Sequence, residues 1–263
     1  MMRATLAAAA ALTMLVGLAG PALAHTAYMK PNYFTTPQRG HVTVEASFAE
    51  EFFVPDFVMK ADDYHVVTPA GTKVKLSSVT YLRDLALFEV DLPENGTYRI
   101  STGVREGAKR PMALVNGQWQ PVRERDGAPA GARVAEAQSI TRADVYVSKG
   151  PASDTALAPT GAGLEIQPLA HPNRLDAGGT LPVRLLLDGK PVAGATISLH
   201  GPGLPDEEDE KAVAVTTDAD GRAGIALPQA GGFVLLARHR VEVAGGPVAV
   251  KSHSVTLTVN VEG

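Results

Sequence analysis

Short runs of alternating apolar and polar residues, separated by turn residues, constrain the fold of this 263-residue chain more than any other feature. The run at 41–48, HVTVEASF, places an apolar residue at every second position. This period of two puts the apolar side chains on one face of a β-strand. Because 26 Gly and 19 Pro supply turns and helical patterns are few, the sequence predicts an all-β protein.

Turn signals in the first half of the chain predict two hairpins. The strands expected there lie at 28–34, 41–48, 85–92 and 98–101. The turn residues of 35–40 join the first two strands. Asn95-Gly96 joins the last two, since Asn-Gly between alternating segments is a strong hairpin signal. Antiparallel pairing about 35–40 also brings the start of the first strand opposite residues 49–51.

Residues 102–138 interrupt the alternation with charges and glycines, and we interpret them as an insertion in the first domain. Asn116-Gly117 predicts a small hairpin inside it. The only tryptophan, Trp119, has two interpretations: it fills the edge of a core, or it stacks on a ligand. A long run without clear periodicity is often functional or mobile.

A segment rich in Pro, Ala and Gly at 151–163 is typical of a linker. It divides the chain into a domain at 25–157 and a second domain at 160–263. The second domain is expected to hold several short strands with closely spaced turns, as Greek-key sandwiches do. The predicted architecture is therefore two tandem β-sandwich domains, Ig-like or transthyretin-like.

The first 24 residues have the pattern of a cleaved signal peptide. A charge at Arg3 precedes an apolar run at 4–18, which is too short to span a bilayer, and Ala22 and Ala24 supply small side chains before the cut. We expect a periplasmic protein that does not span the membrane and begins at His25. Cleavage removes one Arg and no acid, so the formal charge changes from -4 to -5, which does not favour nucleic-acid binding.

A terminal histidine can bind a metal ion through two of its own nitrogens, the α-amine and the imidazole Nδ1. A free amine and an imidazole lose protons near pH ~8 and ~6.5, so a metal can displace those protons at modest cost. The first predicted hairpin also brings Glu50, Glu51 and Asp56 towards His25. Two nitrogens with carboxylates suit a divalent transition ion. The alternative is that these acids are solvated loop charges and that His25 follows the cut by chance.

The last predicted hairpin, between strands at 233–243 and 248–261, offers a second set of ligands. If its turn is centred near residue 246, His239 and His253 lie opposite each other with Cβ atoms about 5 Å apart, whereas a slip of one residue sends them to opposite faces. The chain has no cysteine, so thiolate metal sites are excluded. The candidate metal ligands are therefore His25, Glu50, Glu51, Asp56, His239 and His253.

Three segments of the second half resemble the transthyretin-like and carboxypeptidase-regulatory sandwich: DGKPVAGA at 188–195, TTDADGR at 216–222 and GGFVLLA at 231–237. Together with the exported start and GLEIQP at 163–168, they make the mature chain similar to the domain-of-unknown-function 4198 family (DUF4198). That family was once described as a nickel-transport-complex subunit. The resemblance implies a periplasmic protein connected with metal transport.

The leading hypothesis is a metal-binding accessory protein, not an enzyme, that presents a divalent nickel, cobalt or copper ion to a membrane transport system. The alternative is a two-domain interaction module that docks on a membrane or envelope partner without metal. A copper oxidase built on the terminal histidine, like polysaccharide monooxygenases, needs an aromatic-lined face, and only 5% of the residues are aromatic. Neither Gly-x-Ser-x-Gly nor His-Glu-x-x-His occurs, so hydrolases lack support.

Overall fold

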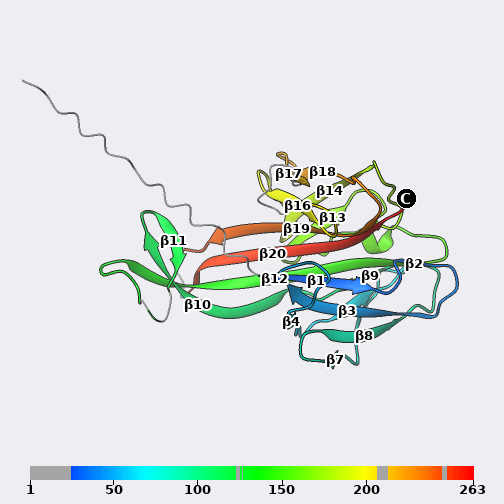
Figure 1. Ribbon diagram of the computed structural model, residues 1–263, viewed down its shortest axis with the longest axis horizontal. Coiled ribbons are helices and arrows are strands. Elements are labelled where there is room, and N and C mark those ends of the chain that lie inside the picture. Colours follow the sequence, from blue (N-terminus) through cyan, green and yellow to red (C-terminus); the bar gives the residue numbers. More distant parts are fainter. Residues whose placement is uncertain (1–24, 123–124, 126, 206–212, 245–247) are drawn as a thin grey trace, which may run out of the picture.

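The computed structural model describes residues 25–122, 125, 127–205, 213–244 and 248–263, which form three β-sheets (Figure 1). The expected signal peptide at 1–24 and the centre of the turn near residue 246 lie outside the described residues. Within the described ranges the only helical element is a short 3-10 turn at Thr155–Leu157, so the all-β prediction is confirmed. No helix in this part of the chain is long and apolar enough to cross a membrane.

We name the three sheets by their place in the fold. The N-terminal sheet contains β1 (Thr26–Pro31), β3 (His41–Ala49), β4 (Phe57–Val58), β7 (Thr80–Tyr81) and β8 (Ala86–Asp91). The C-terminal sheet contains β13 (Leu164–Pro168), β14 (Thr180–Leu187), β15 (Lys190–Pro191) and β18 (Arg222–Ala226). The central sheet contains β2 (Thr35–Thr36), β5 (His65–Val67), β6 (Lys73–Lys75), β9 (Gly96–Ser101), β10 (Arg105–Val115), β11 (Gln118–Pro121), β12 (Arg133–Lys149), β16 (Thr196–His200), β17 (Val213–Thr216), β19 (Gly231–Glu242) and β20 (Val248–Val261).

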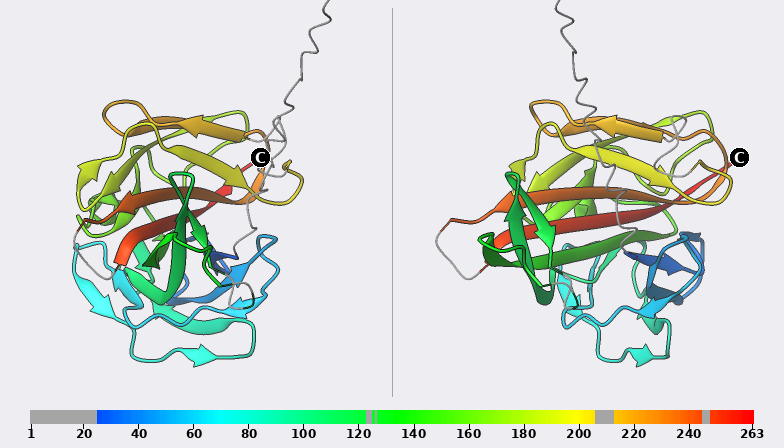
Figure 2. Two further views of the ribbon diagram at one scale, coloured as in Figure 1. Left: turned by 90° about the vertical axis from the view of Figure 1, so that its left-hand side faces the viewer. Right: turned by 60° about the vertical axis from the view of Figure 1, so that its left-hand side comes forward.

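The central sheet lies between the other two sheets, so the molecule has three layers (Figure 1; Figure 2). Its strand β12 comes from the first half of the chain and pairs in parallel with β20, the last strand. Val145 of β12 packs in the core on the N-terminal side, and its neighbour Tyr146 packs in the core on the C-terminal side. Two hydrophobic cores therefore share one sheet. The division at 25–157 and 160–263 remains a prediction, and the sheet is continuous across it.

The first predicted hairpin is confirmed. β1 pairs antiparallel with β3, and Thr26 lies opposite Ala49, so His25 lies level with the turn that begins at Glu50. Val42, Val44 and Ala46 of β3 are buried, because this face of the strand covers the core shared with the central sheet, and Phe48 is half-buried at its edge.

The second predicted hairpin is wrong. β8 pairs with β3 in the N-terminal sheet, whereas β9 pairs with β12 and β5 in the central sheet, so Asn95-Gly96 joins two layers. The Tyr98 hydroxyl holds this corner: it donates to the Glu94 carbonyl at 2.8 Å and accepts from the Glu94 amide at 2.9 Å. A tyrosine that bonds back to the backbone a few residues upstream is a known corner device of β-sandwiches.

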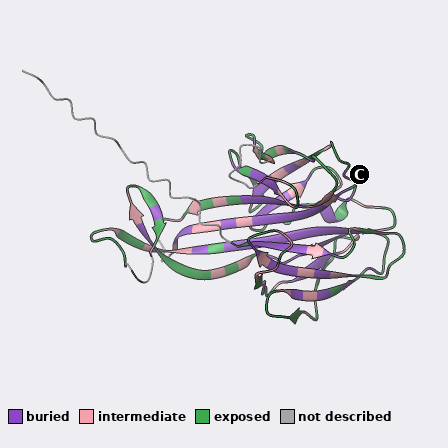
Figure 3. Ribbon diagram, viewed as in Figure 1, coloured by how far each residue is buried: buried purple, intermediate pink, exposed green. Residues whose placement is uncertain are grey.

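The described residues of 102–138 form a β-structured arm, built from β10, β11 and the first part of β12. The hairpin expected at Asn116-Gly117 is confirmed, and its φ angles of 51° and 78° suit a tight two-residue turn. Trp119 is buried with Met112, Ala249 and Val250, so it fills the edge of a small core. The arm projects beyond the three layers and is largely exposed (Figure 3).

A buried cluster of charges links the two halves of the chain. Arg142 Nη2 lies 2.8 Å from Asp144 Oδ2, and Arg142 Nη1 lies 3.3 Å from Glu165 Oε2. Arg99 is buried in the same cluster. Burial alone would raise the pKa of Asp144, but the positive charges of Arg142 and Arg99 hold that pKa below its ordinary value. Two acids and two guanidinium groups thus balance one another inside the fold.

Candidate metal centre

His25 and Asp56 meet at one end of the N-terminal sheet. The imidazole Nε2 of His25 lies 3.6 Å from Oδ2 of Asp56. They come together because β1 pairs with β3, and the chain then turns back into β4 directly after Asp56. The structure thus places one of the three predicted carboxylates beside the predicted terminal histidine.

Backbone groups fix the position of Asp56. Its Oδ2 accepts a hydrogen bond from the Glu50 amide at 2.8 Å, and its own amide donates to the Phe48 carbonyl at 3.0 Å. The Phe57 ring meets the His25 ring edge to face, with 4.7 Å between centroids, and so limits how the imidazole turns. The side chains of His25 and Asp56 are 37% and 36% exposed, which leaves this corner open to solvent.

The orientation of the His25 ring decides which nitrogen is available to a metal ion. Nε2 is directed at Asp56 at an ion-pair distance, longer than a hydrogen bond. A carboxylate on this side favours the tautomer with the proton on Nε2 and the lone pair on Nδ1. Nδ1 is also the nitrogen that chelates together with the amine of the same residue. Asp56 is therefore placed as a positioning group behind the ring.

Glu50 and Glu51 are exposed on the turn that precedes Asp56. Glu50 contributes its amide to the Asp56 carboxylate. Within the described ranges neither glutamate carboxylate forms an ion pair with His25, whose ion-pair partner is Asp56. The ligand role of the two glutamates stays a prediction, and their exposure agrees with the alternative of solvated loop charges.

The register predicted for the last hairpin is confirmed, since His239 and His253 are direct partners in the ladder of β19 and β20. The pair points away from His25. Arg238, the neighbour of His239, reaches Thr26 Oγ1 at 3.0 Å, and adjacent residues of a strand point to opposite faces. The structure therefore does not bring the histidine pair and His25 together around one ion.

Across the described ranges, no three His, Asp or Glu side chains are gathered closely enough to hold a metal ion. At the His25 corner a further nitrogen donor has to come from the terminal amine. That amine exists only when the chain begins at His25. A metal site of the predicted kind thus depends on cleavage before this residue.

Two further histidines have structural partners. His171 Nε2 lies 2.9 Å from Thr97 Oγ1, and His171 Nδ1 accepts from the Asn173 amide at 3.2 Å. These contacts tie the loop after β13 to β9. On the buried strand β5, His65 Nδ1 donates to the Asp63 carbonyl at 2.7 Å. The positions of both rings are explained without a ligand.

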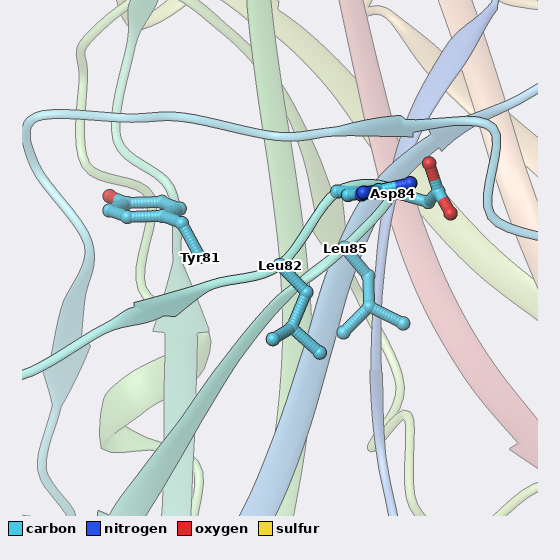
Figure 4. Close-up of a pocket in the computed structure, with 5 residues that line it drawn as sticks. Tyr81, Leu82, Asp84 and Leu85 are labelled. Atoms are coloured by element: carbon cyan, nitrogen blue, oxygen red, sulfur yellow. The ribbon is translucent and has the colours of Figure 1, made fainter.

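A shallow pocket of about 610 Å³ lies at the turn between β7 and β8, on the outer edge of the N-terminal sheet (Figure 4). Leu82 and Leu85 lie side by side there, and the Asp84 carboxylate points away from them (Figure 4). The lining residues are Tyr81, Leu82, Arg83, Asp84 and Leu85. They include no histidine, so the pocket offers apolar surface instead of a nitrogen-ligand site.

Stability should fall as the pH drops below about 6.5. Burial lowers the pKa of His65, His171 and His253. These rings therefore stay neutral in the folded protein at a pH where the unfolded chain already binds protons, so protons favour unfolding. Urea midpoints between about pH 7.5 and 5.5 measure the effect. A midpoint that is flat or rises on acidification contradicts it.

Comparison with known proteins gives one family match and several distant structural similarities. The family model described as "Domain of unknown function (DUF4198)" matches residues 22–241, and no curated protein matches the chain. The D0-D1 domain of Intimin is 13% identical, with a TM-score of 0.25, over 89% of this chain and 97% of that chain. The Yersinia pseudotuberculosis adhesin InvE is 11% identical, with a TM-score of 0.23, over 90% of this chain and 58% of that chain.

Proposed function

The chain belongs to the domain of unknown function 4198 (DUF4198) family, and on that premise we propose that it is an exported accessory protein that binds a divalent transition-metal ion. The ion is nickel, cobalt or copper. The protein is not an enzyme but presents the ion to a membrane transport system. The leader pattern at 1–24 supports the periplasm as its place of action.

One observation carries the proposal: the ring of His25 lies 3.6 Å from a carboxylate that backbone hydrogen bonds hold in place. With Asp56 beside Nε2, the Nδ1 of His25 and the amine released by cleavage are the two nitrogens left to close a chelate ring. An outer carboxylate of this kind orients a ligating imidazole and raises its basicity.

The donor types select the class of ion. Imidazole and amine nitrogens suit nickel, copper and cobalt, whereas calcium and magnesium prefer oxygen ligands. Two nitrogens from one exposed residue leave the remaining coordination positions to water, to Glu50 or to Glu51. A partner protein can reach such an ion and take it over, so the open site suits delivery better than storage.

Calorimetric titration of nickel, cobalt and copper into the chain that begins at His25 tests the proposal. We expect that one extra Ala before His25 removes one bound ion per chain, because the amine nitrogen then becomes part of a peptide bond. Asp56→Asn should weaken binding about 10- to 100-fold. Glu89→Gln, at an exposed position on β8, is the control and should change the affinity little.

Two results would contradict this proposal: no uptake of any of the three ions by the correctly processed chain, or equal binding by the extended chain. Affinity should also fall as the pH drops below about 6 to 7, because both nitrogen donors must lose protons. An affinity that does not depend on pH in this range would point to other ligands.

A second candidate function is an interaction module that docks on a membrane or envelope partner without metal. Its support is the arm of β10, β11 and β12, which projects beyond the three layers (Figure 1) and where Val134 is 53% exposed. The alanine-extended chain separates the two candidates. In cells, the extended chain should no longer support metal delivery if the protein acts through His25. It should work as well as the unextended chain if the protein is a docking module.

A further inference from the structure

The ladder of β19 and β20 places two imidazoles side by side. His239 and His253 are direct partners in antiparallel register, so their Cβ atoms lie about 4.5–5.5 Å apart on one face of the central sheet. Further along β20, the residues of the same parity, Val255 and Leu257, pack in the core with the C-terminal sheet. Both histidine rings therefore point towards the C-terminal sheet.

One ring nitrogen of His253 is buried without a partner. The residue is only 7% exposed, and its Nδ1 makes no hydrogen bond to any other described residue. Buried polar atoms in native folds are nearly always paired, so an unpaired one needs an explanation such as an ion. A bound metal ion would supply the missing partner of Nδ1.

The charges around the pair are compatible with a cation. Burial contributes most to the lowered pKa of His253, which keeps the ring neutral and its lone pair available at neutral pH. The Asp188 carboxylate acts in the opposite direction, while His239 and Lys251 add to the lowering. Asp188 is held on the turn after β14, where the Gly163 amide donates to its Oδ1 at 2.8 Å. Its negative charge offsets part of the charge of Lys251.

We propose that His239 and His253 form a second divalent-metal site, separate from the site proposed at His25. Its ligands are Nδ1 of His253 and one ring nitrogen of His239, with water in the remaining positions. The ion belongs to the class that imidazole binds well: zinc, nickel or copper. His239 is less deeply buried than His253, which leaves an entry path from solvent on its side of the ladder.

The two proposed sites differ in what they require. The His25 site needs a free terminal amine. The histidine pair lies on the opposite face of the central sheet, and its ligands do not depend on cleavage. An alanine added before His25 therefore removes the first site and leaves the second, so the failure of one proposal can be distinguished from the failure of the other.

The test is a titration of zinc, and separately of nickel, into the alanine-extended chain. We expect one ion to bind per chain. His239→Ala should weaken the binding of this ion by more than ~10-fold, the cost of losing a residue that only supports a metal ligand. His41→Ala removes an exposed histidine from β3 and is the matched control, expected to bind like the parent chain. Lys251→Gln removes an opposing positive charge and should tighten binding.

A second measurement needs no substitution in the buried strand. Zinc added to the isotope-labelled extended chain should shift the imidazole NMR signals of His239 and His253 and leave those of His41 in place. Three results would overturn the proposal: no ion bound by the extended chain, equal binding by folded His239→Ala, or zinc-induced shifts at His41 as large as those of the pair.

Discussion

Asp144→Ala is expected to lower the free energy of unfolding by about 3–5 kcal/mol. Asp144 is 3% exposed, lies 2.8 Å from Arg142 and interacts electrostatically with Arg99. Removing its carboxylate leaves two buried guanidinium groups with only Glu165 to balance them, and an uncompensated buried charge is strongly destabilising. Urea denaturation of the mature chain at neutral pH measures the change.

The exposed pair of Lys109 and Glu136 provides the matched control. Lys109 Nζ and Glu136 Oε2 are 3.8 Å apart and both side chains are 46% exposed, so Glu136→Ala should change the free energy of unfolding by less than about 1 kcal/mol. Asp144→Asn keeps the size of the side chain but not its charge, and should also destabilise the fold. If Asp144→Ala costs no more than Glu136→Ala, the buried cluster does not stabilise the junction between the two cores.

Alternation and turn residues predict individual strands well because both act over a few neighbouring residues. The hairpins at 35–40, at Asn116-Gly117 and between β19 and β20 are all present. The parallel pairing of β12 with β20 could not be predicted this way, because no short turn sets the register between two distant segments. At Asn95-Gly96 a dipeptide that favours hairpins joins two sheets, because Tyr98 bonds back to Glu94 and fixes a corner.

Counting from a turn predicts which residues lie opposite each other, as for His239 and His253, because one turn fixes a whole ladder. Counting does not predict which layer each face meets, so it could not show that the fold keeps this pair apart from His25. Sequence reasoning missed the buried charge cluster, although a signal for it exists. Arg142 and Asp144 are two residues apart on a strand and directly precede the run Val145-Tyr146-Val147, so both charges point to one buried face.

Phe233→Ala is also expected to lower the free energy of unfolding by about 3–5 kcal/mol. Phe233 on β19 is 1% exposed and packs in the core between the central and C-terminal sheets. Removing its ring leaves a cavity that the surrounding side chains fill only in part. β19, β20 and β12 are neighbours in one sheet, and β12 also contributes to the other core. The substitution should therefore shift a single unfolding transition of the whole molecule.

Two probes and a control test this expectation. Phe57→Ala removes the same ring from a position that is 57% exposed, and should change the free energy of unfolding by no more than about 0.5 kcal/mol. Far-UV circular dichroism follows all three sheets, whereas the fluorescence of Trp119, the only tryptophan, follows the arm. A single far-UV transition in Phe233→Ala indicates that the continuous sheet couples the two cores into one cooperative unit, and a coincident Trp119 midpoint adds the arm to that unit. Two separate far-UV transitions would mean that the cores unfold independently, as tandem domains do, and that the parallel pair of β12 and β20 transmits little stability between them.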